Sequence, residues 1–152
     1  MGLFYYICNM IQYISPPRRI VLNNELSEVG KIRDFLLPLC RECHIDEDTV
    51  KRLNLAIEEW FVNIVNYAYP DGVSGTADMT AHVSNDGILK VVISDRGVPF
   101  DPTKLAEVDV HANLDQRTVG GLGIHLIRTI MDTMSHERTD DGRNVLTLTK
   151  QL

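Results

Sequence analysis

Three stretches of the chain carry apolar residues at helical spacing. They run from about Ser27 to His44, from Asp46 to about Ala68, and from Gly123 to Met134. Asp46 is a suitable cap for the second stretch, because its carboxylate can accept from the free backbone N–H groups of a first helical turn. Pro38 falls inside the first stretch and predicts a kink, since proline lacks an N–H group and crowds the preceding turn. The pattern therefore predicts three long helices.

Short apolar runs bounded by turn residues predict the strands. The candidate strands are 18–22, 76–84, 88–94, 135–139 and 144–150. Asn85, Asp86 and Gly87 give a strong hairpin signal between the second and third of these, and Asp140 to Gly142 separates the last two. Strands joined by hairpins, together with three helices, predict an α+β fold. We expect a two-layer α/β sandwich with a mostly antiparallel sheet and helices on one face.

Composition narrows the class of protein. The chain has 152 residues, of which 44% are apolar and 24% charged, as expected for one globular domain. The net charge of -6 argues against direct binding of nucleic acid, whose phosphates are held chiefly by lysine and arginine. It does not exclude a nucleotide, because a divalent cation and backbone N–H groups at a helix start can hold a triphosphate.

The first residues of the chain are apolar but do not predict an export or membrane segment. Residues 1–14 lack a basic region and a cleavage site, are too short to cross a bilayer, and end at Pro16 and Pro17. Three cysteines, an odd number, predict free thiols in a reducing compartment, so we expect a cytoplasmic protein with no membrane contact. Residues 1–17 are assigned to an N-terminal extension, which is an extra arm, a docking strand or a misassigned start, and 18–152 to the domain.

Cys40, Cys43 and His44 form the pattern C-x-x-C-H, which is formally the attachment signature of c-type haem. Haem attachment needs export, and the chain offers no convincing export signal. The pattern also lies at the end of the first amphipathic stretch. Small, half-buried residues that close a helix are therefore the favoured interpretation.

Three polar motifs follow one another in the rest of the chain. Glu59 and Asn63 are four residues apart, so a helix projects them from one face, and Asn66 joins them at the next turn. An amide oxygen is a suitable neutral ligand for Mg²⁺. Asp95 follows an apolar run, so it is expected at the end of a strand and facing a cleft, with Gly97 allowing close approach of the backbone.

The third motif is rich in glycine and precedes the last helix. Gly120, Gly121, Leu122 and Gly123 leave backbone N–H groups unhindered at the positive end of that helix, which favours an anion. Residues 101–119, between the second and third motifs, form a long polar connection that we expect to be functional. Each motif alone is weak evidence, and their order is what makes them specific.

Together these segments resemble a known superfamily. LNLAIEEWFVNIVNYAYPDG, VVISDRGVPFDP and GGLGIHLIRTIMD resemble the N box and the two glycine boxes of the GHKL ATPases. The PFDP ending and the closing GRNVLTLTK look most like the anti-sigma factor serine/threonine kinases, and the resemblance covers residues 18–152. It implies the Bergerat ATP-binding fold, with ATP and Mg²⁺ as cofactors.

The resemblance also implies roles for particular residues. Asn63 would hold the metal, Glu59 would act as general base, and Asp95 would read adenine. The resemblance makes the connection 101–119 a lid over the nucleotide, and Arg117 in this lid would reach the terminal phosphate. Thr147 would meet adenine through water. The remaining nucleotide-site residues are Asn66, Gly97, Phe100, Gly120, Gly121, Leu122 and Gly123, with core packing favoured over base stacking for Phe100.

Two functions are compatible with these motifs. The first is an anti-sigma regulatory factor that sequesters a sigma factor and phosphorylates a serine or threonine of an anti-anti-sigma, STAS-type, antagonist. The second is a nucleotide-gated protein-binding module that transfers no phosphate. Glu59 favours the enzyme. Relatives in this family act as homodimers, which is the expected state here.

Overall fold

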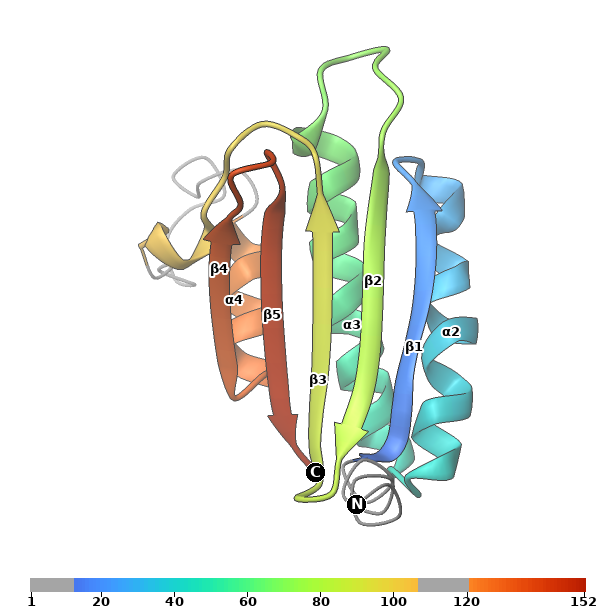
Figure 1. Cartoon of the computed structure of the whole chain (residues 1–152). Coiled ribbons are helices and arrows are strands. Elements are labelled where there is room, and N and C mark those ends of the chain that lie inside the picture. The colour runs from blue at the N-terminus through green and yellow to red at the C-terminus, as the bar shows by residue number, and fades with distance from the viewer. Residues whose placement is uncertain (1–12, 107–120) are drawn as a thin grey trace, which may run out of the picture.

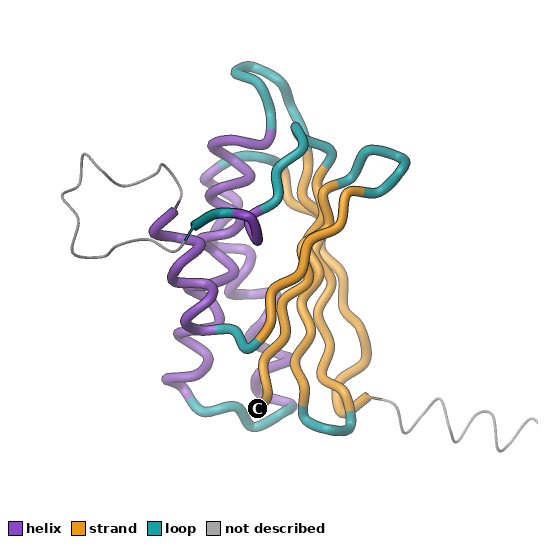
Figure 2. The backbone as a smooth tube through the Cα atoms, turned by 90° about the vertical axis from the view of Figure 1, so that its left-hand side faces the viewer, coloured by secondary structure: helices purple, strands orange, loops and turns teal. Residues whose placement is uncertain are grey.

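The computed structural model describes residues 13–106 and 121–152, and it has two layers (Figures 1 and 2). One layer is an antiparallel sheet of five strands in the order β1-β2-β3-β5-β4. The strands are β1 (Tyr13–Asn23), β2 (Thr76–Ser84), β3 (Ile88–Asp95), β4 (Thr133–Arg138) and β5 (Asn144–Gln151). The helices of the described residues, α2 (Val29–Glu42), α3 (Glu47–Asn63) and α4 (Gly121–Ile130), cover one face of this sheet (Figure 2). The predicted α+β sandwich is therefore confirmed.

Alternation along the strands places the core between the two layers. In β2 every second side chain is buried, from Ala77 and Met79 to Ala81 and Val83, because successive side chains of a strand point to opposite faces. Helix α3 lies between the other two helices in Figure 1 and contributes Leu53, among other fully buried side chains, to the core. The sheet face away from the helices carries the more polar members of each strand.

Helix α3 begins and ends at residues that position the site. Its predicted cap is confirmed, because the Asp46 carboxylate accepts from the Thr49 N–H at 2.9 Å. After Asn63 the helix continues as one π-helical segment, Ile64–Ala68, before the chain leaves it. Such wider turns occur mostly as single insertions and often at functional sites.

Several predicted boundaries were wrong. Strand β1 starts at Tyr13, so residues 13–17 belong to the sheet, and register shifts near the two prolines accommodate them on an edge strand. Helix α2 ends at Glu42 rather than His44 and contains Pro38, where the kink stays a prediction. Helix α4 ends at Ile130 rather than Met134, because the Asp132 N–H bonds to Thr149 of β5 at 2.9 Å and the chain joins the sheet at Thr133.

The C-x-x-C-H pattern lies at the end of α2, as the favoured interpretation predicts. Cys40 lies in α2 with only 3% of its surface exposed, and Cys43 follows the last helical residue. Burial, and secondarily the neighbouring Cys43, raises the pKa of the Cys40 thiol to about 11. Both thiols are free, and a buried, protonated Cys40 is a poor site for covalent attachment.

The described helices were compared with the length and hydropathy that a membrane span requires. Within residues 13–106 and 121–152, no helix has the length and apolar character needed to cross a bilayer.

Candidate functional site

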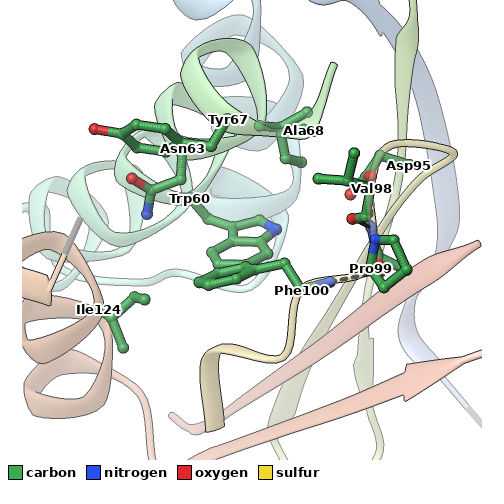
Figure 3. Close-up of a pocket in the computed structure, with 11 residues that line it drawn as sticks. Trp60, Asn63, Tyr67, Ala68, Asp95, Val98, Pro99, Phe100 and Ile124 are labelled. Atoms are coloured by element: carbon green, nitrogen blue, oxygen red, sulfur yellow. Dashed lines mark hydrogen bonds between the residues drawn. The ribbon is translucent and has the colours of Figure 1, made fainter. Parts of the chain in front are cut away.

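A cleft opens where the end of α3, the end of β3 and the start of α4 come together. It has a volume of ≈ 290 Å³, which suits a nucleobase or nucleoside rather than a whole nucleoside triphosphate. Its walls include Trp60, Asn63, Tyr67, Asp95, Phe100 and Asn144 (Figure 3). The predicted residues Asn63, Asp95 and Phe100, far apart in the sequence, therefore share one cavity.

Asp95 lines this cleft and is only 3% exposed. Its Oδ1 accepts from the Gly97 N–H at 2.8 Å and from the Asn144 side-chain amide at 2.9 Å. Among the described residues, no hydrogen bond goes to Oδ2. One carboxylate oxygen is thus fixed by the protein, and the other is left to accept a hydrogen bond from a ligand.

Asn144 is a site residue that the sequence analysis missed. The first residue of β5 pairs with Asp95, the last residue of β3, and its amide also donates to the Val98 carbonyl at 2.9 Å. Its Oδ1 accepts from Arg138 at 3.0 Å and from the Phe100 N–H at 3.3 Å. The sequence could have indicated Asn144, because antiparallel pairing of the two predicted strands places their polar ends side by side.

Gly97 allows two segments of the cleft wall to pack closely, in addition to the backbone approach to a ligand that the sequence predicts. A β-carbon at this position would lie 2.6 Å from the Ala68 β-carbon and even nearer to the Ala68 carbonyl oxygen. The same carbonyl accepts from the Val98 N–H at 2.8 Å. Glycine is therefore required so that the segment after β3 can lie directly against the π-helical end of α3.

Gly97→Ala is expected to destabilise the protein by about 1–3 kcal/mol, because the new methyl group meets backbone that cannot move aside. Urea unfolding monitored by circular dichroism measures the change. Gly30→Ala is the matched control: outside its chain neighbours and its own helix backbone, no atom of the described residues lies within 4 Å of the new β-carbon, so the helix should gain about 0.5–1 kcal/mol. Equal stability of the Gly97 variant and the unaltered chain would contradict the close approach to Ala68.

The N box and the second glycine box meet at the other end of the cleft. A β-carbon on Gly123 would lie 2.9 Å from Glu59 Oε2 and 3.7 Å from Asn63 Nδ2. The start of α4, which begins at Gly121, thus lies directly beside the polar face of α3. The juxtaposition that the motif order predicted, a carboxylate and an amide next to a glycine-rich helix start, is present.

This end of the cleft fits a magnesium ion that is shared with phosphates. Asn63 Nδ2 is buried and has no hydrogen-bond partner among the described residues, so the protein does not fix which way the amide points and its oxygen can turn toward a metal. No cluster of three or more acidic, histidine or cysteine side chains that could hold a metal exists among the described residues. Mg²⁺ needs few protein ligands when it bridges substrate phosphates and keeps waters. The amide of Asn63 beside the carboxylate of Glu59 meets that requirement.

Two predicted residues lie away from the cleft, while Glu59, Gly97 and Gly123 adjoin it without forming its walls. Asn66 is exposed, because the wider π turn moves it round the helix and leaves Tyr67 at the cleft instead. Thr147 pairs with Val92 on the sheet face away from the helices, since alternation in β5 turns Leu146 and Leu148 toward the core. Tyr67 is therefore a second residue that the sequence analysis missed.

Other predicted residues are only partly placed. Gly121 is buried at the start of α4, and Leu122 exposes 50% of its surface there; neither lines the cleft. Gly120 and Arg117 lie outside the described residues. Their assignment to phosphate binding stays a prediction.

Phe100 is not a core residue, contrary to the favoured interpretation. It is 41% exposed and stacks on Trp60 in the cleft, with ring centroids 6.1 Å apart and planes 17° from parallel (Figure 3). Helical spacing with Leu53, Ile57 and Ile64 predicts that Trp60 faces the core. It does so, but its ring also forms a wall of the cavity.

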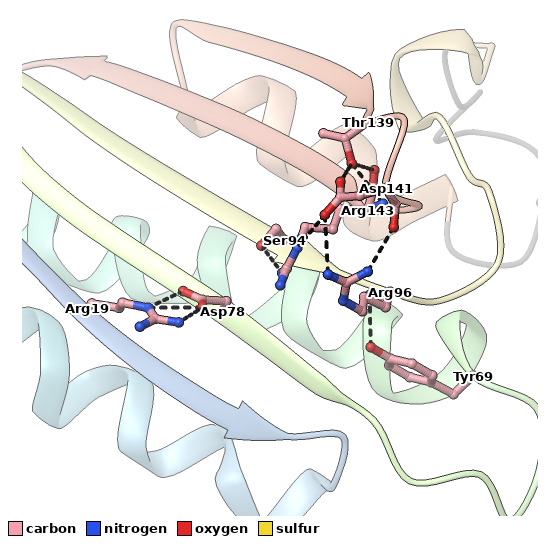
Figure 4. A network of polar contacts seen from close by, with 8 residues as sticks. All are labelled: Arg19, Tyr69, Asp78, Ser94, Arg96, Thr139, Asp141 and Arg143. Carbon is pink, nitrogen blue, oxygen red and sulfur yellow. Dashed lines mark hydrogen bonds and ion pairs between the residues drawn. The ribbon is translucent and has the colours of Figure 1, made fainter.

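A polar network fixes the segment that follows Asp95 (Figure 4). The Arg96 N–H donates to Tyr69 Oη at 3.0 Å, and its guanidinium reaches the Asp141 carbonyl at 2.8 Å. Thr139 and Arg143 hold the same hairpin turn around Asp141. These contacts join the end of α3, the end of β3 and the β4–β5 turn, and so keep Asp95 opposite Asn144.

The start of the long connection is also anchored. Asp101 accepts from the Thr103 N–H at 2.9 Å and lies 3.7 Å from His136 Nδ1. Arg128 of α4 donates to three backbone carbonyls of this segment, at 3.0–3.2 Å from Pro102, Thr103 and Leu105. The beginning of the connection is therefore tied to the glycine-box helix.

Comparison with known proteins identifies the family. Residues 22–150 match the family described as the histidine kinase-like ATPase domain. The chain is 32% identical over 122 residues to the serine-protein kinase RsbW of Bacillus licheniformis, covering 77% of this chain and 74% of the relative. It is 29% identical over 128 residues to RsbW of Halalkalibacterium halodurans, covering 82% and 76%.

Solved structures show the same fold. The RsbU and RsbW domains of a Mycobacterium tuberculosis protein superpose with a TM-score of 0.64 at 21% identity, over 90% of this chain and 32% of that one. The SiaB–SiaC complex of Pseudomonas aeruginosa gives 0.58 at 17% identity, over 97% and 95%. The sandwich is thus the Bergerat fold, and the chain belongs to the histidine kinase-like ATPase domain family of the GHKL superfamily, in the group of RsbW-type serine kinases.

Proposed function

We propose that the chain is an anti-sigma regulatory factor that uses ATP and Mg²⁺ to phosphorylate a serine or threonine of an anti-anti-sigma antagonist. One observation carries the proposal. Glu59 and Asn63 adjoin Gly123 at one end of a cleft whose other end holds Asp95 and Asn144. That arrangement offers a base-reading carboxylate and a phosphate-facing helix start to the two ends of one nucleotide.

Binding would be shared among groups with distinct tasks. Asp95 would accept a hydrogen bond from the exocyclic amine of adenine, while Asn144 and Gly97 hold the carboxylate in place. Backbone N–H groups at the start of α4 would meet the phosphates. Asn63 would hold Mg²⁺, which when bound neutralises phosphate charge and orients the terminal phosphoryl group.

Catalysis would depend on position and on one proton transfer. Glu59 would accept the proton of the attacking serine or threonine hydroxyl as the bond to the γ-phosphorus forms and the bond to the β-phosphate oxygen breaks. Arg117, from the lid, would reach the terminal phosphate. ADP and the phosphorylated antagonist are the products.

The partners follow from the relatives rather than from a surface of this chain. RsbW and BtrW are named as serine or serine/threonine protein kinases, and SiaB was solved in complex with SiaC. By this likeness we propose a sigma factor and a STAS-type antagonist as alternative partners of a cytoplasmic homodimer. A nucleotide-gated module without transfer is the competing function.

Labelling distinguishes the two functions. The purified chain is incubated with γ-labelled ATP, Mg²⁺ and proteins that co-purify with it from its source cell. We expect label on a serine or threonine of one such protein, and none when Mg²⁺ is chelated. Tight ATP binding with no label on any partner would overturn the kinase proposal and support the binding module.

A further inference from the structure

Trp60 carries a hydrogen-bond donor that the protein does not use. The indole is 97% buried, since only 3% of the residue is exposed, and it forms one wall of the cleft. Its Nε1–H has no hydrogen-bond partner among the described residues. Leaving a buried donor without a partner destabilises the folded state, so such groups are rare unless something else supplies the acceptor.

The orientation of the indole indicates where that acceptor comes from. In Figure 3 the nitrogen edge of Trp60 faces the side of the cleft formed by Val98 and Asp95, whereas the ring face carries Phe100. The walls on that side are lined by apolar groups and by the Asp95 carboxylate, whose Oδ1 is already engaged. Trp60 and the unused oxygen of Asp95 thus border the same cavity, and neighbouring side chains cover the indole nitrogen itself.

Phe100 is an exposed part of this wall. Its ring is 41% exposed and rests on Trp60, while its backbone N–H is held by Asn144 at 3.3 Å. The backbone can therefore stay in place while the side chain turns outward, as exposed side chains change rotamer on the picosecond to nanosecond scale. Such a turn would uncover the indole next to the cavity.

A purine base matches this pair of groups. Adenine has an exocyclic amine that donates and ring nitrogens N1, N3 and N7 that accept, so a base that gives its amine to Asp95 retains acceptors for a donor elsewhere on the wall. We propose that Trp60 is a specificity-determining residue of the nucleotide site, whose Nε1–H donates to a ring nitrogen of the bound base. The inference rests on the proposed ATP site.

The first test uses the fact that Trp60 is the one tryptophan of the chain. An ¹H–¹⁵N correlation spectrum of the protein therefore contains a single indole N–H signal. On saturation with ATP we expect that proton to shift downfield and to exchange more slowly with water. A signal that stays unchanged while ATP binding is independently detected would overturn the inference.

The second test removes the donor and retains an aromatic ring. Trp60→Phe is expected to weaken ATP binding about tenfold, measured by calorimetry on a variant whose unfolding midpoint shows that it is folded. The 1-deaza, 3-deaza and 7-deaza analogues of ATP then identify the acceptor. One analogue should bind the unaltered chain more weakly than ATP does. The variant should bind that analogue and ATP with equal affinity.

The outcomes distinguish failure of the Trp60 contact from failure of the ATP site. If Trp60→Phe binds ATP as tightly as the unaltered chain, or loses the same factor for all three analogues as for ATP, the role of the indole is wrong and the ATP site stands. If the unaltered chain does not bind ATP, both the site and the inference fail. Should the variant not fold, the indole spectrum of the unaltered chain decides.

Discussion

Glu59→Gln is expected to lower the rate of phosphoryl transfer by about 10²–10⁴-fold while the affinity for ATP changes little. Proton transfer by a positioned general base contributes that much, and glutamine has the shape of glutamate but cannot take the proton. Glu59 Oε2 lies beside Gly123 rather than beside the base-reading end of the cleft. Transfer from γ-labelled ATP to the antagonist and calorimetric titration with ATP measure the two quantities.

The adjacent carboxylate offers a matched control. Glu58 lies in a groove between α2 and α3 and is 3.9 Å from Arg33, on a different side of the helix from Asn63. Because residues one position apart differ by about 100° around a helix, Glu58→Gln removes the same charge without reaching the cleft. Its transfer rate should match that of the unaltered chain. Wild-type transfer by Glu59→Gln would show that another group takes the proton.

Residue type and motif order were sufficient to predict the parts of the site that α3 and β3 carry. Asn63 and Asp95 lie in one cleft because helical spacing fixes the first and the end of an apolar run fixes the second. The fold class followed from the same patterns. These features depend on local periodicity, which a single sequence shows directly.

The errors arose where position depends on a backbone detail or on pairing. The π-helical segment exchanged Asn66 for Tyr67, and no residue pattern announces a single wide turn. Thr147 was assigned by resemblance, but strand alternation turns it away and gives the position opposite Asp95 to Asn144. Trp60 has helical spacing typical of a core residue, so only three-dimensional packing shows that its ring also borders the cavity.

Asp95→Asn is expected to weaken ATP binding about tenfold to a hundredfold, as loss of a hydrogen bond to a charged acceptor implies. The substitution keeps an oxygen for Gly97 and Asn144, which hold Oδ1 in the unaltered chain, so the fold should persist. The new amide group then replaces the free oxygen and presents a donor to the donating amine of adenine. Calorimetric titration with ATP measures the loss, and Asp78→Asn, on the opposite sheet face where the carboxylate pairs with Arg19, is the control.

A change in the ligand makes this prediction specific to the amine. Purine riboside triphosphate lacks the exocyclic amine, so the unaltered chain should bind it more weakly than ATP by roughly the factor that Asp95→Asn costs. The variant should show no preference for ATP, because it cannot accept a hydrogen bond from the amine. If Asp95→Asn still prefers ATP by the full factor, the carboxylate fixed by Asn144 is a structural group and adenine is read elsewhere in the cleft.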